Sequence, residues 1–352
     1  MTAMDEGMLV YAVVDRGRDR ETCPLTGAHD APIEMIRCRD LSVAASPVDL
    51  EHFGRDSPES LRADLQKYQA VNLALLGRYH AVAPMRFGLT ARNRAHAAEV
   101  LDTAYVQLRA LLNRLAGKVE MIFHAFWDLN PVLKEIASRD ERVTRPCQSP
   151  SADSDLSGFG RRLFEAAEAR RRDLSRAFHA RLAPCAVDFS DGRAPAESPG
   201  RLEWIFTRSY LVERDREQQF GTVVDELGAT HDSTLTFEIA GPLPPYNFAQ
   251  VDLRRGNFDV VDHARRSLSL PERATLEQVK AAYRKLAFDL HPDRSPENPG
   301  ALDRFRAATR AFEVLEAYCG GFPATPGTGE YSFAKPDVEG VFVATGRSPC
   351  HE

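Results

Sequence analysis

The chain has 352 residues, of which 45 are lysine or arginine and 51 are aspartate or glutamate, so its formal net charge is −6. With 43% apolar residues it has the composition of a globular protein, and its length predicts more than one domain. This composition excludes a mainly disordered chain and disfavours a strongly basic nucleic-acid-binding protein. No apolar run approaches the roughly 20 residues of a membrane span, and Asp5 and Glu6 stand where a secretory signal carries basic residues. We therefore expect a cytoplasmic protein.

The sequence predicts an N-terminal α+β domain over residues 1–116. Short segments rich in β-compatible residues predict three strands, at residues 8–14, 33–39 and 41–45. Two helices follow, at residues 60–79 and 94–116. The apolar face expected for the first helix consists of Leu61, Leu65, Tyr68, Leu75 and Tyr79. The second helix has a continuous apolar stripe, and Gly117 supplies the left-handed residue that ends it.

A second α+β domain is predicted over residues 117–250. It begins with an alternating strand at 118–127, which Asn130 and Pro131 are expected to end. After a linker rich in Ser, Pro and Asp, the expected elements are a long helix from about residue 159 to 182, strands at 186–189 and 202–213, a helix at 215–227 capped by Asp215 and stopped at Gly228, and a strand at 234–239. This order, strand-helix-strand-strand-helix-strand, is that of a ferredoxin-like split βαβ fold.

The third segment, residues 258–319, is predicted to be all helical. Thr275 and Gln278 form a capping box that starts a helix, and this helix ends at His291-Pro292-Asp293, because Pro292 disfavours a helical residue before it. A second helix after Gly300 is expected to present Leu302, Phe305, Phe312 and Leu315 to the first, which gives an antiparallel helical hairpin.

The remaining residues, 320–352, form a Gly/Pro-rich tail that looks extended or disordered. Its apolar residues are suited either to adding a strand to a sheet edge or to threading across a domain, and the sequence leaves both open. These residues are Tyr331, Phe333, Val341, Phe342 and Val343.

The helical hairpin resembles a J domain along that domain's second and third helices. The resemblance is carried by Ala281-Ala282-Tyr283-Arg284-Lys285-Leu286-Ala287, His291-Pro292-Asp293, Phe305 and Ala311-Phe312-Glu313-Val314-Leu315. It implies docking on a DnaK-type chaperone and stimulation of that chaperone's ATP hydrolysis. The trigger would be His291, Pro292 and Asp293, and electrostatic docking would fall to Lys280, Arg284, Lys285 and Arg294. Asp289 and Leu290 stand where the family often has a basic residue and a tyrosine, which predicts weaker docking than usual.

The first 250 or so residues resemble the gas vesicle accessory protein family GvpF/GvpL. Four separated stretches carry the resemblance: Pro84-Met85-Arg86-Phe87-Gly88, Gly117-Lys118-Val119-Glu120, Tyr210-Leu211-Val212-Glu213-Arg214 and Gly241-Pro242-Leu243-Pro244-Pro245-Tyr246-Asn247-Phe248. The family implies two α+β domains, the second of them a modified ferredoxin-like fold. It also implies binding to the small, very apolar shell protein of gas vesicles, a part in assembling the shell, and no enzymatic activity.

Two other classes of function find little support in the sequence. For an enzyme, no catalytic motif is present, and Gly158-Phe159-Gly160 lacks the third glycine of a phosphate-binding loop. The six cysteines are scattered, so we expect no disulfide framework, no metal site and no cofactor. For a nucleic-acid-binding protein, the arginine-rich helix around Arg161 to Arg181 also carries acidic residues and lacks interleaved aromatic residues, which favours a solvated helix face.

The two resemblances together imply a gas vesicle assembly factor that binds the apolar shell protein and recruits a DnaK-type chaperone through a fused J domain. Its partners would be the shell protein, other assembly proteins and the chaperone, and its location the cytoplasm in association with gas vesicles. The alternative is a J-domain adaptor that serves a different client and has no part in gas vesicles.

Overall fold

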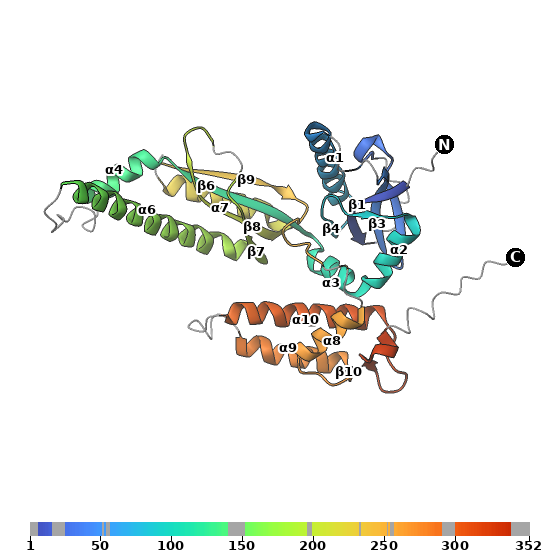
Figure 1. Ribbon diagram of the computed structural model, residues 1–352. Helices are drawn as coiled ribbons and strands as arrows, with labels where there is room; N and C mark the ends of the chain where they lie inside the picture. Colours follow the sequence, from blue (N-terminus) through green and yellow to red (C-terminus); the bar gives the residue numbers. More distant parts are fainter. Residues whose placement is uncertain are drawn as a thin grey trace. The chain divides into compact units, whose positions relative to one another are not determined.

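The computed structural model describes residues 6–15, 25–50, 53, 57–139, 152–195, 199–231, 234–251, 253, 257–290 and 300–338. The chain forms two compact units, drawn in Figure 1. The first unit combines Met1–Ala116 with Ala249–Glu352, and the second consists of Gly117–Phe248. Each unit contains helices and an antiparallel sheet, which confirms the α+β fold class. No helix among the described residues is long and apolar enough to cross a membrane.

The larger sheet of the first unit has the strand order β2-β3-β1-β4, with β5 also paired to β1. Its strands are β1 (Glu6–Asp15), β2 (Glu34–Cys38), β3 (Leu41–Asp49), β4 (Val82–Pro84) and β5 (Thr90–Ala91). The three strands predicted at 8–14, 33–39 and 41–45 are thereby confirmed. β1 lies in the centre of the sheet and is buried from residue 7 to residue 14, so it forms the core of this unit.

The helix α1 (Pro58–Leu76) follows this sheet, but its buried face differs from the predicted one. Leu61 and Leu65 are 42% and 39% exposed, while Asp64 and Asn72 are buried. The reason is hydrogen bonding, because Asp64 Oδ1 accepts from the backbone N–H of His29 at 3.3 Å. The predicted apolar face was therefore wrong at Leu61 and Leu65, since hydropathy alone does not anticipate buried polar partners.

The second predicted helix is divided in two, α2 (Arg94–Thr103) and α3 (Tyr105–Leu115). The two meet at Ala104, whose φ of −101° and ψ of 12° depart from helical geometry. The prediction of one continuous helix was wrong here, because the apolar stripe continues across the break. Gly117, with a φ of 68°, has the predicted left-handed conformation.

The second unit has a sheet with the strand order β7-β8-β6-β9, in which neighbouring strands are antiparallel. Its elements are β6 (Lys118–Trp127), α4 (Leu129–Arg139), α6 (Ala152–Leu182), β7 (Asp188–Asp191), β8 (Glu203–Glu213), α7 (Glu217–Thr230) and β9 (Leu235–Leu243). Numbered within the unit, this order is 2-3-1-4, so the first and third strands are central, as the split βαβ prediction requires. Phe123, Phe178 and Phe237 pack against one another in the core.

β6 ends at Trp127 as predicted, and Pro131 lies in the first turn of α4, an unpredicted helix in which a proline at this position costs no helical hydrogen bond. Other boundaries in this unit differ from the predicted ones. α6 begins at Ala152, before the predicted start near residue 159. α7 starts at Glu217 after a 3₁₀ turn, without a cap from Asp215, and continues through Gly228 to Thr230. β9 runs past Gly241 as far as Leu243.

The C-terminal part of the first unit contains α8 (Asn257–Ser267), β10 (Arg273–Thr275), α9 (Leu276–Leu290), α10 (Ala301–Gly321) and β11 (Glu330–Ser332). α9 and α10 pack side by side as the predicted hairpin (Figure 1). At its centre the ring of Tyr283 stacks on that of Phe312, with 4.6 Å between the centroids. Leu302, expected in this interface, is 40% exposed.

The described part of the tail, up to residue 338, contributes β11 to a two-stranded sheet with β10, so the segment predicted to be all helical also contains a short strand. β11 pairs antiparallel with β10, which places Tyr331 opposite Ala274. Phe333 is 1% exposed, and Tyr318 Oη donates to the backbone oxygen of Ser332 at 2.7 Å. Val341, Phe342 and Val343 lie outside the described residues.

Candidate functional site

The start of α9 is fixed by the capping box that the sequence predicts. The N–H of Thr275 donates to Gln278 Oε1 at 2.8 Å, and the N–H of Gln278 donates to Thr275 Oγ1 at 3.2 Å. These reciprocal bonds satisfy N–H groups that a helix start leaves without partners. At the other end α9 reaches Leu290, the residue before His291. His291, Pro292, Asp293 and Arg294 themselves lie outside the described residues.

The solvent side of α9 carries the predicted basic residues. Arg284 and Lys285 are exposed and Lys280 is half-buried. Within the described part of the chain none of the three forms an ion pair, and the contact of Arg284 that is seen is a 3.3 Å hydrogen bond from its Nε to the backbone oxygen of Lys280. Their positive charges therefore remain available to an acidic partner.

Phe288 extends this face by one helical turn toward His291. The spacing of four residues from Lys280 to Arg284 to Phe288 places the three on one side of the helix. Phe288 is 63% exposed, which is unusual for so large an apolar side chain. The sequence analysis did not single it out, although its spacing from Arg284 was the available signal.

Three of the four stretches that match the gas vesicle family meet at one end of the second unit's sheet. They are the first residues of β6, the last residues of β8, and the segment that ends β9 and follows it. Glu120 on β6 lies opposite Leu211 on β8 and Leu243 on β9. The N–H of Arg214 donates to the backbone oxygen of Gly117 at 3.0 Å. We call this group of residues the motif cluster: Gly117–Glu120, Tyr210–Arg214 and Gly241–Phe248.

A buried carboxylate joins these stretches. The side chain of Glu120 is fully buried, and its Oε2 accepts the backbone N–H of Asn247 at 3.0 Å. The side-chain amide of Asn247 donates to Glu120 Oε1 and, at 3.0 Å, to Ser209 Oγ. These bonds supply the partners that a carboxylate needs away from water. The hydrogen bonds between Glu120 and Asn247 thus attach the segment after β9 to β6, a central strand of the sheet.

The other members of the last stretch pack against this arrangement. Gly241 has a φ of 150°, and a Cβ there would lie 2.7 Å from Met121 Sδ and 2.9 Å from the backbone oxygen of Glu120. The predicted site residues Pro244, Pro245 and Phe248 are buried, Tyr246 is half-buried, and Gly241 and Pro242 are exposed. Most of the motif cluster therefore holds the sheet end together.

The remaining stretch forms the turn between β4 and β5 in the first unit. The N–H of Leu89 donates to the backbone oxygen of Arg86 at 3.0 Å, and Gly88 has a φ of 87°. This is the geometry of a type II turn, in which the third residue must adopt a positive φ. The ring of Phe87 packs edge-on against Tyr68 at 5.3 Å, while Arg86 is exposed. Of the predicted residues here, only Arg86 offers its side chain to a partner.

Burial raises the pKa of several phenols and thiols. It raises the pKa of Tyr68, whose hydroxyl donates to the backbone oxygen of Met85, to about 12. It also raises the pKa of the thiols of Cys38 and Cys319, to about 11 and about 12. Both cysteines are therefore neutral thiols near pH 7, which are weak nucleophiles and weak metal ligands.

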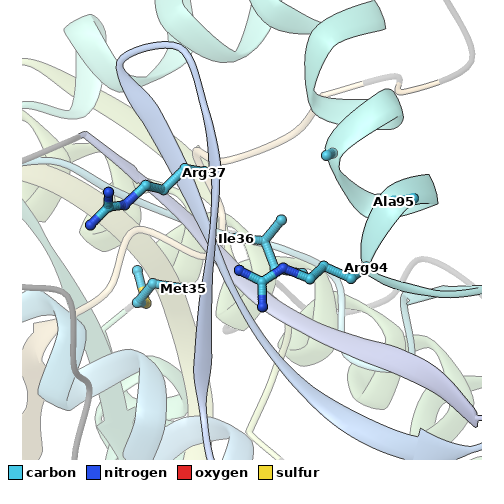
Figure 2. Close-up of a pocket in the computed structure, with 6 residues that line it drawn as sticks. Met35, Ile36, Arg37, Arg94 and Ala95 are labelled. Carbon is cyan, nitrogen blue, oxygen red and sulfur yellow. The ribbon is translucent and has the colours of Figure 1, made fainter. Parts of the chain in front are cut away.

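A cavity of about 680 Å³ lies between β2 and α2. Figure 2 shows Ile36 on the α2 side of β2 and Met35 and Arg37 on the opposite side, with Arg94 reaching from α2 toward the strand. Arg94 Nη1 donates to Glu34 Oε2 at 3.0 Å, so its charge is partly neutralised. The described residues that line this cavity offer cationic and apolar groups.

The arginine-rich helix predicted around residues 161–181 is α6, and several of its arginines are ion-paired. Arg171 pairs with Glu168 at 3.1 Å and Arg176 with Asp173 at 2.6 Å on the helix itself. Arg170 and Arg181 pair with glutamates of α4 and α7. Among the described residues no group of three or more His, Cys, Asp or Glu side chains is placed to hold a metal ion.

The sequence profile described as gas vesicle synthesis protein GvpL/GvpF matches residues 7–250. The chain belongs to this family. Gas vesicle protein F2 of Halobacterium salinarum is 28% identical over 220 residues, which cover 62% of this chain and 80% of the relative. Gas vesicle protein F of a Streptomyces species is 30% identical over 204 residues, which cover 55% of this chain and 82% of that relative.

Solved structures of this family have the same fold. The crystal structure of the gas vesicle protein GvpF from Anabaena has a TM-score of 0.61 at 20% identity, and covers 70% of this chain and 99% of its own. That of GvpF from Microcystis aeruginosa has a TM-score of 0.56 at 17% identity, with coverages of 70% and 99%.

A second profile, the DnaJ domain, matches residues 266–318. Chaperone protein DnaJ 2 of Mycolicibacterium paratuberculosis is 50% identical over 50 residues, which are 14% of this chain and 13% of that relative. The chain spans about an eighth of such DnaJ relatives, so what it shares with them is the J domain. Both resemblances seen in the sequence are confirmed: this is a gas vesicle protein of the GvpL/GvpF family that carries a J domain, and both are non-enzymatic kinds of protein.

Proposed function

We propose that this protein assists gas vesicle assembly by bringing a DnaK-type chaperone to the apolar shell protein. In this proposal the residues of the GvpL/GvpF family region bind the shell protein or an early assembly complex. The J domain binds the chaperone through Lys280, Arg284, Lys285 and Arg294, and triggers its ATP hydrolysis through His291, Pro292 and Asp293. The protein acts in the cytoplasm, at growing vesicles.

The observation that carries the proposal is the presence of both families in one chain, with the basic face of α9 exposed. A shell protein that is very apolar aggregates in water unless its surface is covered. A chaperone that binds and releases apolar segments serves such a client, and a J domain fused to the client-binding protein raises the chaperone's effective concentration at the client. This gain in effective concentration would explain why the two domains share a chain.

The first half of the proposal, recruitment of the chaperone, is tested by measuring the ATPase rate of a purified DnaK-type chaperone with and without the full-length protein. We expect stimulation by the wild type and its loss in His291→Gln. His80→Gln is the matched control, because His80 is an exposed histidine in the first unit, outside the J domain. No stimulation by the wild type, or equal stimulation by His291→Gln, would overturn this half.

The client half is tested by co-expressing the tagged full-length protein with a gas vesicle shell protein and recovering what binds. Recovery of the shell protein supports the proposal. If it is not recovered while other clients are enriched, the protein is a J-domain adaptor for a different client.

A further inference from the structure

The break between α2 and α3 is bridged by a residue from the C-terminal part of the chain. A helix break leaves backbone groups without helical partners. Here the N–H of Val106 donates to Asn257 Oδ1 at 2.9 Å, and Asn257 Nδ2 donates to the backbone oxygen of Asp102 at 3.1 Å. Asn257 is the first residue of α8 and is 6% exposed. Its amide therefore replaces, at the break, hydrogen bonds that a continuous helix would have made by itself.

A second contact joins the end of α10 to the start of α3. The ring of Phe322 meets that of Tyr105 edge-on at 6.2 Å, and the guanidinium of Arg39 lies 4.7 Å from the Tyr105 centroid and 5.4 Å from the Phe322 centroid. Tyr105 and Phe322 are 4% and 5% exposed. A Cβ on Gly321 would lie 3.0 Å from the Tyr105 ring, so the last turn of α10 is closely packed against it.

The same part of the chain holds the start of α9. β11 pairs with β10, and the N–H of Phe333 donates to the backbone oxygen of Glu272 at 2.8 Å. β10 ends at Thr275, the residue whose side chain caps α9. Tyr318 on α10 contacts the end of β11 in two ways. Its hydroxyl donates to the backbone oxygen of Ser332, and its ring centroid lies 5.7 Å from that of Phe333. α9 is therefore connected to α3 by a continuous series of contacts within the first unit, in which the aromatic side chains of Tyr105, Tyr318, Phe322 and Phe333 are buried.

We propose that Asn257 and Phe322 are positioning residues that hold the J domain in one orientation against the helices α2 and α3 of the N-terminal part of the chain. The purpose of this fixed orientation rests on the proposed function. A chaperone bound at α9 is held at a defined place relative to a client on the N-terminal part of the chain. A J domain on a flexible linker would instead sample many positions, and its effective concentration at the client would depend on linker length. The buried amide and the aromatic contact remove that freedom.

The orientation is tested by backbone amide relaxation in the full-length protein. We expect the amides of α9 and those of β1 to report one rotational correlation time in the wild type. In Asn257→Ala, the amide of Val106 loses its acceptor, and its hydrogen exchange should become at least about tenfold faster. His263→Ala is the control, because His263 is an exposed residue of the same helix. A shorter correlation time for α9 than for β1 in the wild type would overturn the proposal, as would unchanged exchange at Val106 in the variant.

Two functional measurements, stimulation of the chaperone ATPase and solubilisation of the shell protein, distinguish a positioning role from a general effect on stability. Asn257→Ala and Phe322→Leu should leave stimulation of the chaperone ATPase within about twofold of the wild type, because the docking face of α9 is intact. They should reduce chaperone-dependent solubilisation of the shell protein about tenfold, because the chaperone is no longer held near the client. Equal solubilisation by both variants and the wild type would contradict the positioning role. If the proposed function fails, the wild type will stimulate no ATPase, while the relaxation result stands unaffected.

Discussion

The basic face of α9 and the motif cluster of the second unit are both carried by family motifs, yet their side chains are used in opposite ways. On α9 Arg284 and Lys285 are exposed and Lys280 is half-buried, and none of the three forms an ion pair within the described residues. In the motif cluster, Glu120 is fully buried and is held by both the backbone and the side chain of Asn247. The difference teaches that a motif marks either a binding surface or a structural joint, and that burial distinguishes the two.

The strongest way to break this comparison is Gly241→Ala. The new Cβ would meet Met121 Sδ and the backbone oxygen of Glu120 at less than 3.0 Å, on a backbone with a φ of 150°. We expect the unfolding free energy of the second unit to fall by about 3 kcal/mol or more. Denaturant titration followed by tryptophan fluorescence measures it selectively, since the chain's two tryptophans, Trp127 and Trp204, both lie in this unit.

A matched control for that experiment is Gly228→Ala. Gly228 lies in the helix α7, and nothing lies within 4 Å of a Cβ placed there. Alanine is favoured over glycine in a helix by up to about 1 kcal/mol, so this variant should be as stable as the wild type or more so. If Gly241→Ala were as stable as Gly228→Ala, the motif cluster would not be a structural joint.

The next largest effect is expected for the pair Glu120 and Asn247. Glu120→Ala removes the carboxylate that accepts from the backbone and side chain of Asn247, and the loss of hydrogen bonds to a charged group costs about 1.5–3 kcal/mol. Asn247→Ala leaves a buried carboxylate with fewer donors and should cost a similar amount. The double variant should be less destabilised than the sum of the two by about 1–2 kcal/mol, measured by the same titration. Simple additivity would show that the two side chains do not act together.

On α9 the expected effect is on binding and not on stability. Arg284→Glu should weaken chaperone docking about tenfold, because it reverses a charge on the exposed face, and change the unfolding free energy by less than about 0.5 kcal/mol. Docking by the wild type should also weaken with added salt, more steeply than docking by the variant. Binding titrations at two salt concentrations measure both. Arg62→Glu is the control, since Arg62 is an exposed residue of α1, away from α9. If Arg284→Glu lowered the unfolding free energy, the basic face of α9 would have a structural role and would not be only a binding surface.

The smallest effect is expected at Ser269, between α8 and β10. Its φ is 55°, and its N–H donates to the backbone oxygen of Arg266 at 3.0 Å. Glycine adopts this conformation without strain, so Ser269→Gly should stabilise the first unit by about 0.5–1 kcal/mol. Thermal unfolding followed by circular dichroism measures the shift. His263→Gly, at an exposed position inside α8, should be destabilising instead, and a stabilised His263→Gly would refute the conformational explanation.

Local sequence patterns predicted the elements whose signals are local. The capping box at Thr275 and Gln278 forms with both of its hydrogen bonds, and Gly117 adopts its left-handed conformation. The alternating and helical periods of residues 117–250 gave the order of elements that the ferredoxin-like sheet requires. At Ala104 the pattern was wrong, because the apolar stripe continues but the helix does not, and the hydrogen bonds across the break come from the distant residue Asn257.

The site was predictable to the same extent. The basic residues of α9 followed from helical spacing, and their exposure is what the sequence predicts for a solvated face. The role of Glu120 did not follow, because its partner Asn247 lies 127 residues away and hydropathy does not signal which carboxylate is buried. Asn257 was missed for the same reason, since its partners are 151 and 155 residues away.

By itself, the sequence determined the family, the J domain and the order of elements, because motifs, helix caps and hydrophobic periods act over a few residues. Only the tertiary structure decided that the J domain belongs to the same compact unit as the N-terminal sheet, and that the motif cluster is a joint. The physical reason is that buried hydrogen bonds and aromatic contacts depend on which distant residues the fold brings together. That information is distributed over the whole chain and is visible at no single position.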